Sequence, residues 1–326
     1  MKAILIKQKG DPENLIMEEY RKPVSREGFV LIQIKAFGLN KAEIYMRKGE
    51  WEETSDIIGI ECVGIVAEDL SGEFEKGQQV AAIVGGMARS LNGSYAEYTL
   101  VPKTNVLPFK SGLPWNELAA IPETYATAWA ILNWCLEVQP GEKILVRGGT
   151  SALGMACIIL GRQKGLHVIA TSRSEKKLAL LKEMGAQDTF VDQGKIGEEL
   201  SRAYPEGIDK VVELLGNSTL LDSFRPVRPK GAVCVAGFLG GLMPIEKFQP
   251  IFEIPNSIRL STLASAFSFG QKGFEFSKIP LQKIITDIEE KRIPNILRKT
   301  FRAEDIREAH RLVETNEVNG KVVMVW

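Results

Sequence analysis

Histidine is scarce in this chain, whose 326 residues include only two, His167 and His310. A Ser-His-Asp triad or a metal centre with several histidines would have to be built from this pair, so the composition disfavours both. We expect both histidines to be structural, with His310 on a surface-type helix. Cysteine is sparse as well: the four cysteines are dispersed and form no CxxC pair. Their pattern disfavours a zinc knuckle and a disulfide framework and indicates a reducing compartment.

The chain also lacks a charge excess and a long apolar run. Lys plus Arg and Asp plus Glu both number 41, so the formal net charge is zero, whereas nucleic-acid binding usually comes with a basic excess. No uninterrupted apolar stretch approaches the ~20 residues needed to span a bilayer. The apolar residues near the N-terminus are too few for a signal-peptide core. We therefore expect a soluble cytoplasmic protein with neither nucleic acid nor membrane as partner.

The length is about twice the ~150 residues that serve as a prior for one domain, so two domains are expected. Residues 1–115 hold short strands separated by turns, at 29–36, 62–67 and 79–84. Short strands with few long helical patterns are typical of a small β-barrel or sandwich.

Residues 116–265 instead alternate compact apolar strands with helical patterns. Strands are expected at 143–147, 167–171, 189–191, 210–215 and 232–236. Helices are expected at 152–164 and 175–184, and each is followed by a glycine, which favours helix termination. This alternation predicts a parallel sheet covered on both faces, and therefore an α/β fold.

A glycine-rich turn joins the first of these strands to the first helix. Gly149, Ser151 and Gly154 occupy the three positions of the G-x-G-x-x-G fingerprint, which binds a dinucleotide pyrophosphate at a helix N-terminus. We expect Gly149 to permit the tight turn and Gly154 to allow close packing of helix and strand, while the Ser151 hydroxyl can donate to a phosphate oxygen. An ordinary strand–helix connection is the alternative, and the effect of Ser151 on cofactor affinity stays open. The predicted site comprises Gly149, Thr150, Ser151, Ala152, Leu153 and Gly154.

The end of the second strand indicates which cofactor binds. An NAD site usually has an acidic residue there to hold the ribose 2′-hydroxyl. This chain has Ser172, Arg173 and Lys176 instead, a hydroxyl and two cations that favour a 2′-phosphate. Glu175 is expected on the first helical turn, where the helix dipole accounts for an acid. NADPH is therefore the predicted cofactor, and a solvated surface loop is the alternative.

The chain resembles the medium-chain dehydrogenase/reductase superfamily, and within it the zinc-independent quinone oxidoreductase branch. The motifs that carry the resemblance occur in order along nearly the whole chain: 38–49, 58–64, 122–129, the glycine turn, 183–186 and 319–323. The resemblance implies a GroES-like β-barrel catalytic domain and a Rossmann domain with a doubly wound parallel sheet. We assign 1–115 and 266–326 to the former and 116–265 to the latter.

The departures from zinc-dependent relatives concern the metal ligands. Asn40 lies where the segment with the first cysteine ligand begins, and Ile60 replaces the histidine of the Gly-His-Glu motif. An aliphatic side chain offers no lone pair, and a catalytic zinc needs about three protein ligands. The four-cysteine structural lobe is missing too. We therefore expect no metal.

The resemblance implies NADPH-dependent reduction of quinones or other α,β-unsaturated carbonyls by hydride transfer. It places Asn40 and Tyr45 in the substrate pocket as the candidate catalytic residues, with Tyr45 able to hydrogen-bond the carbonyl or relay a proton, or simply to form its wall. Segments 51–54 and 88–93 are expected to border this cleft. Further cofactor contacts are implied for Thr127, Gly237, Phe238, Leu239, Ala264, Ser265, Asn319 and Lys321. Lys321 could instead cap a sheet edge.

The resemblance further implies a homodimer formed through the Rossmann domains. Two alternatives to a quinone or enone reductase stay open. An enoyl-thioester reductase would need a long, basic cleft for a phosphopantetheine chain. A catalytically silent NADPH-binding redox sensor would keep the glycine turn but lose the polar residues of the substrate cleft.

Overall fold

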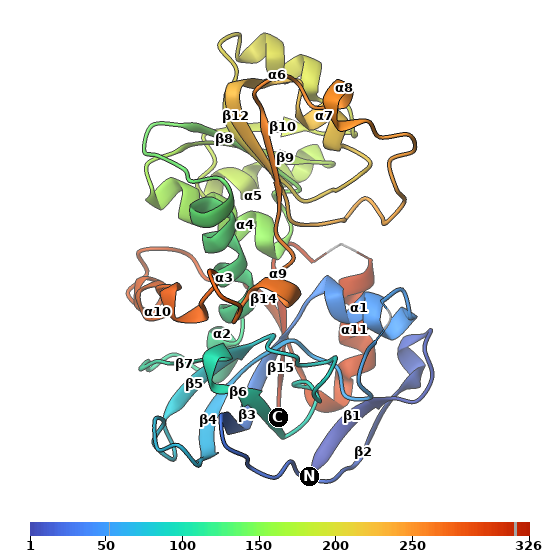
Figure 1. Cartoon of the computed structure of the whole chain (residues 1–326), viewed down its shortest axis with the longest axis vertical. Coiled ribbons are helices and arrows are strands. Elements are labelled where there is room, and N and C mark those ends of the chain that lie inside the picture. Colours follow the sequence, from blue (N-terminus) through green and yellow to red (C-terminus); the bar gives the residue numbers. More distant parts are fainter. Residues whose placement is uncertain (52, 316–317) are drawn as a thin grey trace. The chain divides into compact units, whose positions relative to one another are not determined.

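The structure, a computed structural model, describes residues 1–51, 53–315 and 318–326. The chain divides into two compact units, the first formed by Met1–Ala126 with Ser265–Trp326 and the second by Thr127–Ala264. The first unit thus includes residues 116–126 and Ser265, which the sequence pattern groups with the Rossmann domain (Figure 1).

The first unit is built on a seven-stranded sheet in which β14, β15, β3, β4, β5 and β7 are neighbours in that order and β6 pairs with β3. The strands are β3 (Phe29–Leu39), β4 (Glu61–Asp69), β5 (Gln79–Ile83), β6 (Tyr98–Pro102), β7 (Val106–Pro108), β14 (Leu297–Arg302) and β15 (Lys321–Val325). The chain returns from the second unit to add β14 and β15, so the C-terminal strand pairs antiparallel with β3. Two more strands, β1 (Lys2–Ile6) and β2 (Leu15–Glu19), form a separate hairpin.

The helices of this unit have clear local causes at their ends. In α1 (Lys41–Lys48), the Glu43 carboxylate accepts a hydrogen bond from the backbone N–H of Asn40, and Gly49 ends the helix with φ 80°. That φ lies in the left-handed region that glycine adopts without strain. The other helices are α2 (Trp115–Leu118), α9 (Ser265–Ser268), α10 (Leu281–Glu289) and α11 (Ile306–Glu314), while α3 (Pro122–Ala130) contains the boundary between the units.

The second unit is a six-stranded sheet with the order β10-β9-β8-β11-β12-β13, and every neighbouring pair is parallel. Counted along the chain this order is 3-2-1-4-5-6, the doubly wound Rossmann arrangement. The strands are β8 (Lys143–Arg147), β9 (His167–Ser172), β10 (Asp188–Val191), β11 (Ile208–Glu213), β12 (Val227–Val235) and β13 (Arg259–Thr262). The helices are α4 (Ala152–Gln163), α5 (Leu178–Glu183), α6 (Gly197–Ala203), α7 (Leu220–Ser223) and α8 (Pro250–Glu253).

The core of the second unit explains the continuous apolar strands. Leu145, Ile169, Val211 and Val233 come from four adjacent strands and pack with Phe224 in one buried cluster. A strand covered on both faces needs apolar residues at successive positions. Among the described residues, no helix is long and apolar enough to cross a membrane. The four cysteines are free thiols.

The expectation that His310 lies on a surface-type helix is wrong for its side chain. His310 is fully buried on α11, and its Nε2 lies 2.7 Å from the hydroxyl of Tyr95. Burial lowers the pKa of His310 to about 3, because an imidazolium ion would lose its hydration. The imidazole therefore stays neutral across the physiological range, as expected of a structural histidine.

Candidate functional site

The glycine turn lies at the carboxyl end of β8, the central strand at which the strand order reverses direction. The prediction that Gly149 permits the tight turn is wrong, because the residue with the left-handed backbone is Gly148, at φ +85°. Gly149 is needed for space, since a Cβ there would lie 3.0 Å from Leu181 and 3.2 Å from the carbonyl oxygen of Thr171. A Cβ at Gly154 would lie 2.8 Å from the Cα of Gly149 and closer still to the carbonyl oxygen of Gly148. The close approach of helix and strand therefore requires glycine at 154.

Ser151 occupies the middle position of the fingerprint and caps α4. Its Oγ accepts a hydrogen bond from the backbone N–H of Gly154 at 3.1 Å and donates to the carbonyl oxygen of Gly148 at 2.8 Å. N-capping satisfies an orphan amide of the first helical turn. The hydroxyl that we expect to be able to reach a phosphate is thus engaged in holding the turn itself. Thr150, Ala152 and Leu153 are partly exposed around it.

The end of β9 presents the residues predicted to select the cofactor. Ser172 is buried, and its hydroxyl accepts a hydrogen bond from the backbone N–H of Ser174 at 3.2 Å. Arg173 and Lys176 follow with exposed side chains. The carboxyl ends of β8 and β9 are adjacent because the two strands pair in parallel. The two cations therefore lie beyond the strand next to the glycine turn.

A buried ionic cluster that sequence reasoning missed supports this edge of the sheet. Arg147, the last residue of β8, is fully buried and donates two hydrogen bonds to Asp192, at 2.8 and 3.0 Å. It also donates to Ser223 at 2.8 Å, and Asp222 lies 3.1 Å away. Burial raises the pKa of the neighbouring Glu213, whose carboxylate accepts hydrogen bonds from the amides of Leu215 and Gly216. The sequence signal that could have indicated this cluster is an arginine at the end of an apolar strand, directly before a glycine turn.

The later predicted cofactor residues also follow carboxyl ends of strands in the second unit. Gly237 follows β12, and a Cβ there would lie 2.7 Å from the carbonyl oxygen of Leu214. Leu239 donates its backbone N–H to that same oxygen at 3.0 Å, which fixes the loop that includes Phe238. Ala264 lies just beyond β13, and Thr127, buried on α3, is the first residue of this unit.

Asn40 and Lys321, predicted separately, meet in a buried polar cluster of the first unit. The ammonium of Lys321 lies 2.6 Å from the Glu61 carboxylate, donates to Thr124 at 2.9 Å and also donates to the side-chain oxygen of Asn40. Asn40 in turn donates to Glu61 at 2.9 Å. All three donors of the ammonium are thus used within the cluster. Gly38 makes room for it, since a Cβ there would lie 2.5 Å from both Glu61 and Lys321.

Glu43 borders the same cluster and is fully buried. Its carboxylate accepts hydrogen bonds from the backbone N–H groups of Asn40 at 2.8 Å and Ile60 at 3.0 Å. Burial raises the pKa of Glu43 to about 7, and the hydrogen bonds from Ile60 and the charge of Lys321 only partly oppose the rise. This unit therefore holds a carboxyl that can change its protonation near neutral pH.

The positions of the zinc ligands do not fit a metal. Ile60 is buried where zinc-dependent members of the family that the chain resembles have histidine, and the Asn40 amide is held by Lys321 and Glu61. The ammonium of Lys321 already balances the Glu61 carboxylate. In the part of the chain that the structure describes, no group of three His, Cys, Asp or Glu residues could hold a metal ion.

Tyr45 is half-buried on α1 and stacks against Trp51, with ring centroids 6.1 Å apart and an interplanar angle of 26°. Burial raises the pKa of the Tyr45 phenol, with a contribution from the charge of Glu50. A phenol in that state keeps its proton and can donate it in a hydrogen bond.

Two further predicted residues lie in the first unit. Ser265 donates a hydrogen bond to Glu123 at 2.8 Å. The side-chain oxygen of Asn319 is buried and finds no hydrogen-bond partner among the described residues. A buried amide oxygen without a donor is costly, and a bound ligand would relieve that cost.

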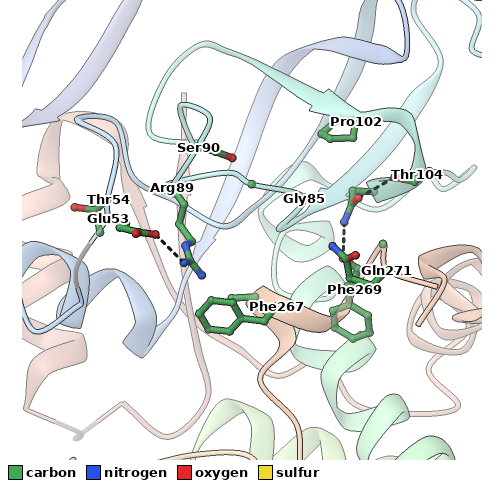
Figure 2. Close-up of a pocket in the computed structure, with 14 residues that line it drawn as sticks. Glu53, Thr54, Gly85, Arg89, Ser90, Pro102, Thr104, Phe267, Phe269 and Gln271 are labelled. Carbon is green, nitrogen blue, oxygen red and sulfur yellow. Dashed lines mark hydrogen bonds and ion pairs between the residues drawn. The ribbon is translucent and has the colours of Figure 1, made fainter. Parts of the chain in front are cut away.

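A pocket of about 640 Å³ lies within the first unit, and four segments contribute to its wall: 53–54, 85–90, 102–105 and 266–271 (Figure 2). Its volume suits a small organic molecule. Glu53, Thr54, Arg89 and Ser90 belong to the segments predicted to border the substrate cleft, whereas Glu52 lies outside the described residues. Tyr45 and Asn40, which the resemblance places in the substrate pocket, are not among the residues that line it. Sequence reasoning also missed the contribution of 102–105.

Comparison with known proteins gives concordant family matches. A family model described as "Alcohol dehydrogenase GroES-like domain" matches residues 26–111, and one described as "Zinc-binding dehydrogenase" matches residues 152–271. The quinone oxidoreductase of Mus musculus is 30% identical over 265 residues, covering 76% of this chain and 75% of that protein.

Solved structures agree over the full length. An NAD-dependent alcohol dehydrogenase superposes with a TM-score of 0.84 at 26% identity, covering 100% of both chains. A mycobacterial protein complexed with NADPH superposes with a TM-score of 0.87 at 23% identity, again covering 100% of both chains, and shares the fold. The predicted fold class, a GroES-like domain with a Rossmann domain, is confirmed.

Proposed function

Because the chain belongs to the medium-chain dehydrogenase/reductase superfamily and is quinone oxidoreductase-like, we propose that it is an NADPH-dependent oxidoreductase that reduces quinones or other α,β-unsaturated carbonyls by hydride transfer without zinc. One observation carries the nucleotide part of this proposal. A glycine turn that tolerates no Cβ at 154 lies at the central strand of a 3-2-1-4-5-6 sheet, beside a strand end with Arg173 and Lys176.

The second unit is proposed to hold the nucleotide. The N-terminal amides of α4 would bind the pyrophosphate, with Gly149, Thr150, Ser151, Ala152, Leu153 and Gly154 forming the cradle. Arg173 and Lys176, with Ser172, would bind a 2′-phosphate through charge-assisted hydrogen bonds. When bound, NADPH supplies the hydride. Further contacts are proposed for Thr127, Gly237, Phe238, Leu239, Ala264, Ser265 and Asn319, and the side-chain oxygen of Asn319, which finds no partner among the described residues, supports its inclusion. The predicted contact of Lys321 is not retained, because the three donors of its ammonium are used within the buried cluster.

The first unit is proposed to orient the carbonyl and supply a proton. Hydride addition develops negative charge on the carbonyl oxygen, which a positioned donor stabilises. Tyr45 is the proposed donor, since its raised pKa keeps the phenol protonated. Asn40 is proposed to line the site with its amide orientation fixed by Lys321 and Glu61. In the proposed zinc-independent reaction, these groups would supply the polarisation that zinc provides in zinc-dependent members of the superfamily.

A quinone or enone fits the pocket better than an enoyl thioester. A phosphopantetheine arm with its phosphates calls for several cations, whereas Arg89 is the one cationic residue among those that line the pocket in the described part of the chain. A silent redox sensor would be expected to have lost the polar residues near the substrate. Asn40, Tyr45 and the cluster around Lys321 are present, which favours an active enzyme.

The test measures binding and turnover together. We expect tighter binding of NADPH than of NADH, and NADPH consumption with quinones and enones but not with enoyl thioesters. The double variant Arg173→Gln/Lys176→Gln should lose about 10- to 100-fold in NADPH affinity, because two charge-assisted bonds to a phosphate are removed, while NADH binding should change little. Lys182→Gln, an exposed lysine on α5, is the control. A preference for NADH would contradict the cofactor assignment, and tight NADPH binding without turnover would favour the silent sensor.

We further propose a cytoplasmic homodimer that associates through its Rossmann domains. The charge balance and the absence of a basic excess support a small molecule rather than a nucleic acid as partner.

A further inference from the structure

We propose that the pocket in the first unit binds a planar, conjugated small molecule that carries a carboxylate, and that Arg89 selects for this charge. The proposal rests on the proposed function in that it names the class of substrate the reductase would take. It depends on the chemistry of one unit alone, because every residue that lines the pocket belongs to the first unit.

The guanidinium of Arg89 is the charged centre of the pocket. Its ion pair with Glu53 is long, at 3.6 Å, and the Glu53 side chain is 85% exposed, whereas that of Arg89 is 26% exposed. Solvated pairs of this kind contribute little stability. A ligand carboxylate can therefore replace Glu53 and gain the bidentate geometry that a guanidinium offers. The described residues supply no other carboxylate within ion-pair distance of Arg89.

An aromatic surface lies directly beside this charge. The guanidinium carbon of Arg89 is 4.1 Å from the ring centroid of Phe267, and Figure 2 shows the arginine side chain reaching toward that ring. Phe267 is 58% exposed although it is large and apolar. Because the guanidinium lies over the face of the Phe267 ring, a flat π-system with an anionic substituent can pack against this pair while its charge binds the guanidinium.

The floor of the pocket is held rigidly. Asn105 is buried and donates hydrogen bonds to the carbonyl oxygens of Ile83 and Phe269, both at 3.2 Å. Gly85 and Gly270 both have positive φ and lie against the Asn105 side chain. A Cβ at Gly85 would lie 2.7 Å from that side chain. The segment with Phe267 is thus tied to the sheet at Phe269. A preformed wall lowers the entropic cost of binding a small ligand.

The lining also limits the ligand's charge. Apart from Arg89 and Glu53, the polar side chains of the wall are neutral: Thr54, Ser90, Thr104, Asn105 and Gln271. A single cation matches one carboxylate, whereas a polyphosphate would require several. A neutral ring system would leave Arg89 with Glu53 and gain no ion pair with the guanidinium.

The test uses two probes that differ in charge but not in shape, naphthalene-2-carboxylate and naphthalene-2-carboxamide, titrated by calorimetry into the intact protein. We expect the carboxylate to bind about tenfold more tightly than the amide at low salt, and the difference to shrink as ionic strength rises. Arg89→Gln should bring the two affinities together. Arg26→Gln is the matched control, since Arg26 lies over the Phe29 ring with its guanidinium carbon 3.7 Å from the centroid, outside the pocket.

Equal affinity of the two probes, no binding of either, or an equal effect of Arg26→Gln would overturn the inference. The comparison in the unaltered protein needs no variant, so a folding defect in Arg89→Gln cannot hide the result. Reduction of a neutral quinone by a protein that does not distinguish the probes would overturn the inference and leave the proposed function intact. Selective binding of the carboxylate without turnover of any quinone or enone would support the inference and contradict the proposed function.

Discussion

At the scale of single residues, Tyr45 is where the proposed chemistry can be tested most directly. Tyr45→Phe keeps the ring that stacks on Trp51 and removes the hydroxyl. If the phenol donates to the carbonyl, kcat with a quinone should fall about 10- to 100-fold, which is typical of a lost proton donor, while NADPH affinity stays unchanged. Tyr98→Phe is the control, because Tyr98 lies on β6 and its ring is covered by the ammonium of Lys22. Unchanged turnover in Tyr45→Phe would make Tyr45 a wall residue.

Glu43 gives a prediction about pH. Its pKa rises to about 7 in the folded protein because burial penalises the carboxylate. A carboxyl with a raised pKa binds its proton more tightly when folded, so its contribution to stability is full below pH 4.5 and is lost as the pH rises to about 7. The loss should amount to about 3 kcal/mol. In thermal unfolding from pH 4.5 to 7.5, the stability of Glu43→Gln should rise relative to that of the wild type as the pH rises. Glu50→Gln, at an exposed site, should show no such trend, and a constant offset for Glu43→Gln would contradict the assignment.

At the scale of elements, helix α4 has two glycines that should respond differently to an added methyl group. Gly154 lies at the junction with β8, and Gly161 lies near the other end of the helix. Gly154→Ala places a Cβ against the backbone of Gly148 and Gly149, which cannot move without opening the turn. The free energy of unfolding should fall by about 1–3 kcal/mol, with a parallel loss of nucleotide affinity. Gly161→Ala meets the Val168 side chain at 3.2 Å instead, and the gain in helix propensity of about 1 kcal/mol should offset that crowding. Equal thermal stability of the two variants would show that the turn is not tightly packed.

The same junction shows what local pattern can and cannot predict. The strand at 143–147 and the start of the helix at Ala152 follow from apolar runs and a glycine turn, and the structure has both. The sequence did not indicate that the Ser151 hydroxyl would cap the helix, or that Gly148 would have a positive φ. Both features depend on how the turn closes. The buried ionic cluster of Arg147 could not be predicted from local pattern, because its partners Asp192 and Ser223 are remote in the chain.

Long-range packing also explains the remaining differences. Asn40 and Lys321 each matched a family motif, but their meeting depends on the pairing of β15 with β3, which no local pattern specifies. His310 looks exposed from its polar neighbours Glu308 and Arg311, yet it faces Tyr95 in the core. Periodicity places a residue on a face of a helix, whereas burial depends on which element covers that face.

At the scale of the whole molecule, the sheet of the second unit has an edge that favours self-association. β13 is the last strand in the order β10-β9-β8-β11-β12-β13, and among the described residues it pairs with β12 alone. An unpaired strand edge can add a strand from a second copy. The chain leading to this strand exposes apolar side chains, with Met243 78%, Ile251 82% and Phe252 79% accessible. Exposed apolar groups of this size, on the segment that precedes an edge strand, are typical of an interface.

The resulting prediction is a symmetric dimer in which two copies of β13 lie side by side. A two-fold axis brings the same patch of both subunits together, so Ile251 and Phe252 would be buried twice in one interface. Ile251→Glu/Phe252→Glu should therefore convert the dimer to a monomer in sedimentation analysis, since burying four carboxylates costs far more than the apolar contact returns. Val24→Glu, at an apolar side chain of the first unit that is 69% exposed, is the control and should leave the dimer intact. A monomeric wild-type protein at micromolar concentration would refute the edge-to-edge dimer, and a dimer that survives the double substitution would place the interface elsewhere.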